Sequence, residues 1–263
     1  MDLGLKGKTV IVTGGASNIG RAITLAFAKE GSNIIMAEIN EAMGKKVADI
    51  ANGMGAGGKC IAVKTDVTKL DEVEAMVRKA MDEFGQINVL VNNVGWDMLK
   101  PFMKTTPELW EKIISLNYRS DLNCLKTVLT HMIEQKGGSI VNIASDAGRI
   151  GEFREAVYSG CKAGVIALSK AIAKEVGSKG IRLNCVCPGV VIPKEEVSKE
   201  SLWTKETMSV FTPEAKETMK GVYALRRLGT AEEIAKPVIF LASDAASFVT
   251  GQTLSVSGGY SMI

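Results

Sequence analysis

Histidine is nearly absent from this sequence, and cysteine is scarce. Among 263 residues there is one histidine, His131, and there are five cysteines. No group of histidine, cysteine or carboxylate residues has the spacing of metal ligands, so no metal site is expected, and a triad that uses histidine as its base is nearly excluded. An odd number of sparse cysteines also argues against a disulfide framework. Cys185 and Cys187, two apart in an apolar run, are expected to fill the core from one face of a strand.

Long apolar runs and a large net charge are missing as well. No run approaches the roughly 18 apolar residues of a membrane-spanning helix. The net charge of +3 is too weak and too dispersed for the basic face that nucleic-acid binding normally requires. The first residues lead into a strand-like run without the apolar core of a signal peptide. We therefore expect a cytoplasmic protein that binds neither a membrane nor nucleic acid.

What the sequence does contain is an alternation of two patterns. Short apolar runs bounded by breakers predict strands, and longer segments with apolar residues three and four apart predict helices. Strands are expected at about 8–13, 33–38, 59–65, 87–92, 139–144, 181–187 and 252–256. Helices are expected from a glycine-rich turn to before Gly31, over 70–84, from the N-cap Thr106 and Pro107 towards His131, over 155–176, and from the capping box of Thr230 and Glu233 to about 242, with Pro237 inside it.

This order of elements predicts the architecture. Strands that alternate with helices of this length specify a parallel sheet with helices on both faces. No repeat, low-complexity tract or linker divides the chain, so residues 1–263 are expected to form one α/β domain of the doubly wound Rossmann type. The long irregular stretch 189–229 follows the sixth strand. Its place at the carboxyl edge of the sheet predicts a lid segment that covers the substrate.

A glycine-rich turn, TGGASNIG over residues 13–20, joins the first strand to the first helix. Backbone N–H groups and a helix N-terminus converge there on a site for a pyrophosphate, and glycine lets the phosphate approach. Glu38 ends the next strand, where its carboxylate can accept both ribose hydroxyls of adenosine and would repel a 2′-phosphate. NAD is therefore expected rather than NADP, the alternative being that Glu38 merely caps a helix. The turn residues proposed to hold the cofactor are Gly14, Ser17, Asn18, Ile19 and Gly20.

Tyr158 and Lys162 lie four residues apart on a predicted helix and therefore share one face. A phenol with an unperturbed pKa of ~10 is a poor base near neutrality. A neighbouring ammonium and an oxidised nicotinamide ring lower that pKa, which makes proton abstraction from an alcohol feasible. Ser145, at the carboxyl end of the fifth strand, can donate a hydrogen bond to the substrate oxygen.

Together with Asp66-Val67, Asn92 to Gly95 and the SVSGG sequence of residues 255–259, these motifs resemble the short-chain dehydrogenase/reductase family over nearly the whole chain. The resemblance implies a Rossmann fold with strand order 3-2-1-4-5-6-7 and a homotetramer. It implies that Lys162 also holds the nicotinamide ribose and that Asn117 positions a water that relays the proton outward. It further implies cofactor contacts from Asp66 and Val67 at the adenine, from Asn93, Val94 and Gly95 along the adenosine and ribose, and from Pro188, Gly189 and Val191 beside the nicotinamide.

The sequence departs from the family pattern in the phosphate turn. The family usually has glycine at the position of Asn18. Asparagine tolerates positive φ better than most residues, and its amide could donate to a phosphate. A smaller departure is Val94, where the family commonly has alanine, and this change is expected to tighten the pocket.

Residues around these motifs are similar to those of hydroxyacyl-CoA dehydrogenases of the 2-hydroxycyclohexanecarboxyl-CoA type, which act in anaerobic degradation of aromatic and alicyclic acids. The similarity lies in residues 93–97, 145–149 and 151–158. Arg149 and Arg154 could meet CoA phosphates, as could Lys194 and Lys199 of the lid, and Trp96 or Trp203 could pack on a ring. Solvated surface charges, or arginines paired with nearby glutamates, and core or interface aromatics are equally open.

Three functions stay open at this point. An NAD-dependent dehydrogenase of hydroxyacyl-CoA thioesters leads. A 3-oxoacyl carrier-protein reductase, or another alcohol or sugar dehydrogenase, is the nearest enzyme alternative; such reductases usually take NADPH, which Glu38 opposes. A non-catalytic partner subunit of a mixed oligomer is the alternative of another class, for which Asn18 is the only indication.

Overall fold

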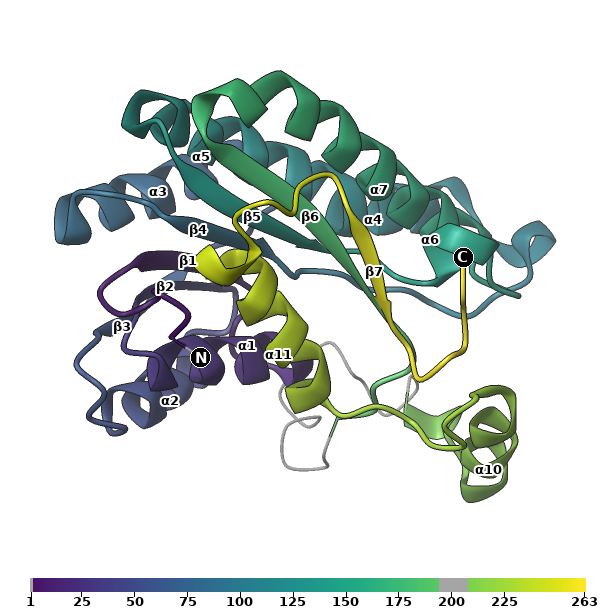
Figure 1. The fold of residues 1–263 in the computed structure, drawn as a ribbon. Coiled ribbons are helices and arrows are strands. Elements are labelled where there is room, and N and C mark those ends of the chain that lie inside the picture. The colour runs from purple at the N-terminus through teal and green to yellow at the C-terminus, as the bar shows by residue number, and fades with distance from the viewer. Residues whose placement is uncertain (1, 194–207) are drawn as a thin grey trace.

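The computed structural model describes residues 2–193 and 208–263. Seven parallel strands form one sheet in the order β3-β2-β1-β4-β5-β6-β7, which confirms the predicted topology (Figure 1). The strands are β1 (Thr9–Thr13), β2 (Asn33–Glu38), β3 (Cys60–Lys64), β4 (Val89–Asn92), β5 (Gly138–Ile143), β6 (Ile181–Pro188) and β7 (Thr253–Val256). All seven predicted strands are present, with ends shifted by at most two residues.

Helices cover both faces of the sheet, as the alternating pattern predicted (Figure 1). One layer consists of α1 (Asn18–Lys29), α2 (Glu41–Asn52) and α11 (Ala231–Ala242), and the other of α3 (Leu70–Phe84), α4 (Pro107–Ile114), α5 (Ser120–Gln135) and α7 (Ala156–Val176). The short α6 (Ala147–Ile150) follows β5, and α10 (Pro213–Val222) projects from the carboxyl side of the sheet. The Thr230–Glu233 capping box opens α11, as predicted, and Pro237 lies inside that helix.

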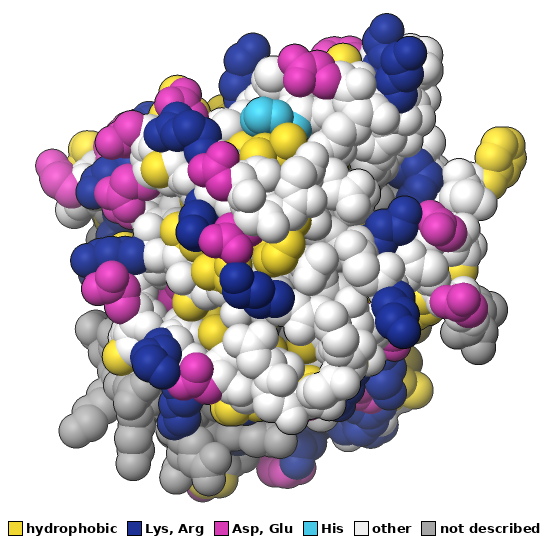
Figure 2. Space-filling model, turned by 90° about the vertical axis from the view of Figure 1, so that its left-hand side faces the viewer, with side chains coloured by type: hydrophobic (Ala, Val, Ile, Leu, Met, Phe, Trp, Pro, Cys, Tyr) yellow, Lys and Arg dark blue, Asp and Glu magenta, His cyan; other side chains and the backbone are white. Residues whose placement is uncertain are grey.

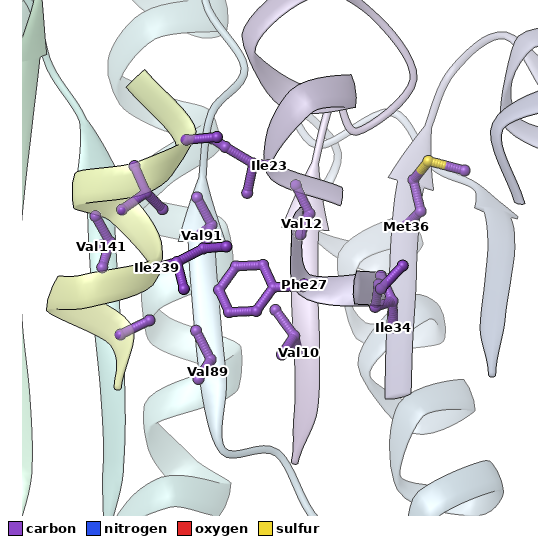
Figure 3. Close-up of a cluster of buried hydrophobic side chains, with 14 of the residues drawn as sticks. Val10, Val12, Ile23, Phe27, Ile34, Met36, Val89, Val91, Val141 and Ile239 are labelled. Atoms are coloured by element: carbon purple, nitrogen blue, oxygen red, sulfur yellow. The ribbon is translucent and has the colours of Figure 1, made fainter. Parts of the chain in front are cut away.

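Alternate residues of the central strands feed two apolar cores, because successive strand side chains point to opposite faces. Figure 3 shows the core beneath α1 and α11, where Phe27 packs among Val10, Val89 and Ile239. The second core, under α3, α5 and α7, includes Ile11, Leu90, Leu125, Val128, Ile140 and Leu183. Cys185 and Cys187, both on β6, are fully buried in a third, smaller apolar cluster, as predicted.

Three features differ from the sequence prediction. The helix expected from Thr106 towards His131 is interrupted by a π-helical turn, Ser115–Arg119, and then continues to Gln135. The stretch 189–229, predicted to be irregular, contains α10, none of whose residues is buried, so no apolar stripe marks it in the sequence. Helices α2 and α6 were not predicted. Lys194, Lys199 and Trp203 lie outside the described residues.

The surface carries both signs of charge intermingled. On the face drawn in Figure 2, lysine and arginine side chains lie among aspartates and glutamates rather than in a separate patch. Ion pairs such as Lys59–Glu83 at 2.9 Å and Lys45–Asp49 at 2.7 Å contribute to this mixture. Within the described part of the chain, no helix combines the length and hydropathy that crossing a bilayer requires.

Candidate active site

The carboxyl ends of the strands bring most of the predicted site residues to one edge of the sheet. The glycine turn follows β1, Glu38 ends β2, and Asp66 follows β3. Asn93 to Gly95 follow β4, and Ser145 follows β5. Because all strands run in the same direction, these segments meet at one side, which is the usual ligand side of such sheets.

The phosphate turn is held closed by contacts between β1 and β4. The Thr13 hydroxyl accepts hydrogen bonds from the backbone N–H of Asn93 at 2.9 Å and of Val94 at 3.3 Å. The Asn93 amide donates to the carbonyls of Thr13 and Gly14 at 3.0 and 3.2 Å. A Cβ on Gly20 would lie 2.0 Å from the Gly14 carbonyl oxygen, so only glycine fits there. Asn93 and Val94 therefore shape the turn as well as lining it.

The N-terminus of α1 is open to an anion. Ser17 is the N-cap residue but makes no side-chain capping bond, and the first turn contains no acidic residue. The initial N–H groups of a helix have no intrahelical acceptor and, with the helix dipole, favour a phosphate. The residues of the turn thus fit a dinucleotide pyrophosphate.

Asn18 adopts φ +41°, the positive value for which asparagine is suited. Its side-chain amide donates to the carbonyl of Val191 at 3.1 Å, whereas the sequence suggested a phosphate as its acceptor. The residue therefore ties the phosphate turn to the segment after β6. Val191 itself is buried.

Glu38 is buried and lies directly against the phosphate turn. Its Oε2 accepts from the backbone N–H of Ala16 at 3.1 Å, and its Oε1 accepts from that of Asn40 at 3.2 Å. Each carboxylate oxygen can accept a second hydrogen bond. The carboxylate thus supports the turn, caps the chain before α2 and keeps acceptor capacity for a ribose.

Asp66 and Val67 lie at the end of β3, where the adenine was predicted. Asp66 Oδ1 accepts from the backbone N–H and the hydroxyl of Thr68 at 3.0 and 2.7 Å, which fixes the carboxylate. Val67 is buried, and its carbonyl accepts from the Asn123 amide at 3.0 Å. The loop is therefore rigidly attached to α5.

Ser145, Tyr158 and Lys162 come together as predicted. The Tyr158 hydroxyl and the Ser145 hydroxyl share a hydrogen bond, and the Lys162 Nζ lies 5.7 Å from the centre of the tyrosine ring. Lys162 is 2% exposed, and its Nζ donates to the Ile143 carbonyl at 2.9 Å. A Cβ on Gly148 would lie 2.6 Å from the Lys162 carbonyl carbon, so glycine there lets α6 approach α7 closely.

Burial controls the electrostatics of the pair. It raises the pKa of the Tyr158 phenol above its usual value, and the Glu155 carboxylate raises that pKa further, whereas the hydrogen bond with Ser145 lowers it. Burial lowers the pKa of the Lys162 ammonium, and Asp121 is the largest opposing influence. In the polypeptide alone, burial and the Glu155 charge thus outweigh the lowering of the phenol pKa that is expected from a neighbouring ammonium.

Asn117 lies within the π-helical turn and is fully buried. Its Nδ2 donates to the carbonyls of Trp96 and Ile113 at 2.6 and 2.8 Å, and its Oδ1 accepts from the Trp96 N–H at 3.1 Å. A Cβ on Gly95 would lie 2.9 Å from Asn117 Oδ1 and 3.3 Å from Lys162 Nζ. Asn117 thus fixes the loop after β4 next to Lys162, and π-helical turns occur frequently at functional sites.

The end of β6 and the segment after it are held near the Ser145 loop by backbone hydrogen bonds. Gly189 N–H donates to the Val256 carbonyl at 3.3 Å, and Val190 N–H donates to the Tyr223 hydroxyl at 2.9 Å. The Pro188 carbonyl accepts from Asp146 N–H at 3.4 Å, next to Ser145. Pro188, Gly189 and Val191 are therefore held near the Ser145 loop.

The three predicted substrate residues have other partners in the structure. Arg149 Nη1 donates to the Thr253 carbonyl at 3.2 Å and to the Ser255 hydroxyl at 2.9 Å, so its guanidinium supports β7. Arg154 is exposed and donates to the Leu99 carbonyl at 3.0 Å. The Trp96 ring has the Lys112 ammonium 3.9 Å from its centre.

Sequence reasoning missed a group of carboxylates beside Tyr158. The Asp97 carboxyl is largely buried, which raises its pKa to about 6, and its Oδ2 has no hydrogen-bond partner within the described residues. Burial, followed by the charges of Asp97 and Glu152, raises the pKa of Glu155 to about 8. Glu152 accepts a hydrogen bond from the hydroxyl of Tyr260. Proximity in sequence to Trp96 and Tyr158 was the only available signal, because charged residues in loops are usually solvated.

The geometry defines a class: a nicotinamide-dependent oxidoreductase with a serine–tyrosine–lysine site. Residues 14–261 match the family model described as enoyl-(acyl carrier protein) reductase. The chain is 41% identical over 256 residues to the 3-oxoacyl-(acyl-carrier-protein) reductase FabG of Chlamydia muridarum, covering 97% of this chain and 98% of that protein. Proteins of the same name from Thermotoga maritima and Staphylococcus aureus are 36% and 35% identical with the same coverage.

The chain therefore belongs to the short-chain dehydrogenase/reductase family. It is an oxidoreductase that acts on a CH–OH group and its carbonyl counterpart. A nicotinamide nucleotide is its cofactor class.

Proposed function

We propose that the protein transfers hydride reversibly between NAD and the secondary alcohol of a hydroxyacyl thioester, giving the ketoacyl thioester. The observation that carries this proposal is the Ser145–Tyr158–Lys162 arrangement at the carboxyl edge of the sheet, next to a phosphate turn that Glu38 closes. A CoA thioester of the 3-hydroxyacyl or 2-hydroxycyclohexanecarboxyl type leads, because of the residues that surround Trp96 and Tyr158.

In this reaction, the Tyr158 phenolate takes the proton of the substrate hydroxyl, and the Ser145 hydroxyl donates a hydrogen bond to the same oxygen. When bound, NAD supplies the hydride acceptor and a positively charged ring. Lys162 holds the nicotinamide ribose and stabilises the phenolate with its positive charge. Asn117 supports the exit route of the proton by fixing the loop after β4 against Lys162.

NAD is favoured over NADP by the charge of Glu38. The carboxylate lies against the Ala16 N–H of the phosphate turn, at the end of β2 where the adenosine ribose binds in Rossmann folds. A 2′-phosphate would bring negative charge against it. The neighbouring Ile39 and Asn40 offer no arginine for such a phosphate.

A 3-oxoacyl carrier-protein reductase is the second candidate, and the names of the relatives favour it. The two candidates share the reaction at the third carbon but differ in the carrier of the acyl group and in the usual direction. The carrier protein is a macromolecule, whereas CoA is a small molecule, so the two can be separated directly. A role in the degradation of aromatic or alicyclic acids belongs to the first candidate only.

The test is a spectrophotometric screen of the purified protein at 340 nm. NAD and NADP are combined with hydroxyacyl-CoA thioesters and the matching free acids, and NADH and NADPH with 3-oxoacyl-CoA and 3-oxoacyl carrier protein. Turnover of the thioesters with NAD, at least tenfold above the free acids, supports the proposal. Reaction only with NADPH and the carrier protein supports the second candidate.

Replacing Tyr158 by phenylalanine tests the mechanism. The variant retains the ring but lacks the acid–base hydroxyl, so turnover should fall by about 10² to 10⁴, the usual contribution of general acid–base catalysis. Titration of intrinsic NADH fluorescence should show cofactor binding within a few fold of wild type. Retained turnover would reject the role of Tyr158, and loss of both properties would point to misfolding.

We further propose that the enzyme is a homotetramer located in the cytoplasm. Support for self-association comes from the family resemblance and from exposed apolar side chains on and near α11 and β7, namely Phe240, Phe248 and Leu254. Support for a reducing compartment comes from five free, buried thiols. Light scattering coupled to gel filtration tests the tetramer.

A further inference from the structure

A carboxylate lies where the sequence pattern of α5 calls for an apolar side chain. Asp121 belongs to the same stripe as Cys124, Leu125 and Val128, at spacings of three and four, and these three residues pack into the core under the sheet. Asp121 is 2% exposed, and its Oδ2 has no hydrogen-bond partner among residues 2–193 and 208–263. Burying an unpaired carboxylate is costly, so a compensating positive charge is expected nearby.

That charge is Lys162 on the neighbouring helix α7. Burial raises the pKa of the Asp121 carboxyl to about 7, and the Lys162 ammonium opposes this rise. In return, Asp121 is the first of the influences that raise the pKa of the Lys162 ammonium against the effect of burial. The geometry supports this link: Asn117 Oδ1 and Lys162 Nζ would lie 2.9 and 3.3 Å from a Cβ on Gly95. Asp121 follows Asn117 by four residues, about one helical turn, and so lies on the same helix face as that residue. Lys162 Nζ in turn lies 5.7 Å from the ring centre of Tyr158.

The other titratable groups around the pair are thiols. Cys124 on α5 and Cys185 on β6 interact with the Asp121 charge, and burial raises the pKa of both. Cys161 on α7 and Cys187 on β6 interact with the Lys162 charge, and burial raises the pKa of both thiols, that of Cys187 to about 12. Neutral thiols supply no countercharge near neutral pH. Within the described residues, Asp121 is therefore the carboxylate that acts on Lys162.

We propose that Asp121 is a positioning residue that keeps Lys162 in its ammonium form behind Tyr158, and thereby sets the alkaline end of the pH range for cofactor binding and turnover. The inference rests on the proposed function for the roles of Lys162 and Tyr158. Without the carboxylate, a buried amine loses its proton at lower pH. A neutral Lys162 then holds the nicotinamide ribose more weakly and no longer stabilises the phenolate.

The experiment uses Asp121→Asn, which keeps the shape of the side chain and removes its charge. NADH affinity is measured by fluorescence titration between pH 6 and pH 10, and kcat/KM is measured over the same range. An opposite charge at close range shifts a pKa by about 1 to 3 units. The alkaline fall in NADH affinity should therefore begin about 1 to 3 pH units lower in the variant, while the affinities at pH 6 agree within threefold.

Lys162→Arg supplies the internal control, because a guanidinium stays protonated throughout this range. In the Lys162→Arg background, Asp121→Asn should leave the pH profile of NADH affinity unchanged. Cys124→Ala, one turn further along the same buried stripe, is the matched packing control and should not move the alkaline limb. Should Asp121→Asn not fold, Asp121→Ser, smaller and also neutral, is measured in the same way.

The proposal is overturned if NADH affinity falls at the same alkaline pH in Asp121→Asn as in the wild-type protein, or if the affinity is lower by the same factor at every pH. It is also overturned if Asp121→Asn shifts the pH of this fall equally in the Lys162→Arg background. The NADH measurement needs no substrate, so its outcome is separate from that of the thioester screen. If no thioester reacted but the limb moved, the substrate proposal would fail and the role of Asp121 would stand.

Discussion

The charge of Glu38 should decide which nicotinamide nucleotide the enzyme takes. Glu38→Gln keeps the length of the side chain and one acceptor oxygen but removes the charge. In the structure each carboxylate oxygen already accepts one backbone N–H, from Ala16 or from Asn40, which leaves about two acceptor positions for ribose hydroxyls. Hydrogen bonds to a charged group are worth about 1 kcal/mol more than neutral ones, so the variant should lose about 2 kcal/mol of NAD binding.

That loss corresponds to NAD binding roughly 30-fold more weakly, since a factor of ten is about 1.4 kcal/mol. NADP binding should improve, because the repulsion between two unit charges 4 Å apart is about 1 kcal/mol in water and larger in a partly buried site. With two charges on the phosphate, the gain is again about 2 kcal/mol. The preference for NAD should therefore fall by about 10³.

The assay is fluorescence titration with NADH and NADPH at low ionic strength, with kcat/KM for both cofactors as a second measure. Glu41→Gln is the matched control, because Glu41 is an exposed glutamate three residues away that pairs with Lys64 at 3.6 Å. It should leave both affinities within twofold. If folded Glu38→Gln kept its NADH affinity and its cofactor preference, Glu38 would be a structural cap and the reasoning would be refuted.

Two further predictions concern the turn and the carboxylates. Gly20→Ala places a Cβ 2.0 Å from the Gly14 carbonyl oxygen, so the turn must shift. NADH binding should weaken at least tenfold, while the circular dichroism spectrum should show that the fold is retained. Unchanged binding would exclude the turn as the phosphate site. Burial and neighbouring charges raise the pKa of Glu155 to about 8. The stability contributed by its protonated form is therefore fully present below pH ~4 and is lost as the pH rises through about 8. The melting temperature of Glu155→Gln should accordingly depend less on pH between pH 5 and pH 8. Alcohol oxidation by this variant should also begin at lower pH, because the glutamate charge no longer raises the pKa of Tyr158; an unchanged pH–rate profile would contradict this.

The fold could be predicted where local pattern and tertiary environment agree. The apolar residues from Leu70 to Phe84 recur at helical spacing, and α3 has those bounds, with Gly85 as its C-cap at φ +70°. The Thr230–Glu233 capping box likewise lies at the start of α11. By contrast, α10 buries none of its residues, so its helical periodicity has no apolar stripe to display.

In the candidate site, too, the residues that a local pattern brings together could be predicted, and the contacts between distant segments could not. Ser145, Tyr158 and Lys162 could be placed together because the helical period and the strand ends bring them close. The acceptor of the Asn18 amide could not be predicted, since Val191 lies 173 residues further along the chain. The partners of Arg149 on β7 are also remote, 104 and 106 residues further along the chain. Asp121 was missed because its burial depends on how α5 packs on the sheet.

The π-helical turn at Ser115–Arg119 has a consequence for how this helix can vary. A regular helix rotates by about 100° per residue, and the wide turn takes up one residue more than an α-helical turn does, so α4 and α5 keep their faces against the sheet. Deleting one residue there should restore regular winding and leave both faces nearly in place, but it would remove the wide turn that holds Asn117 next to Lys162. An insertion elsewhere in α4 or α5 has no such turn to absorb it and would rotate one half of the helix away from the sheet.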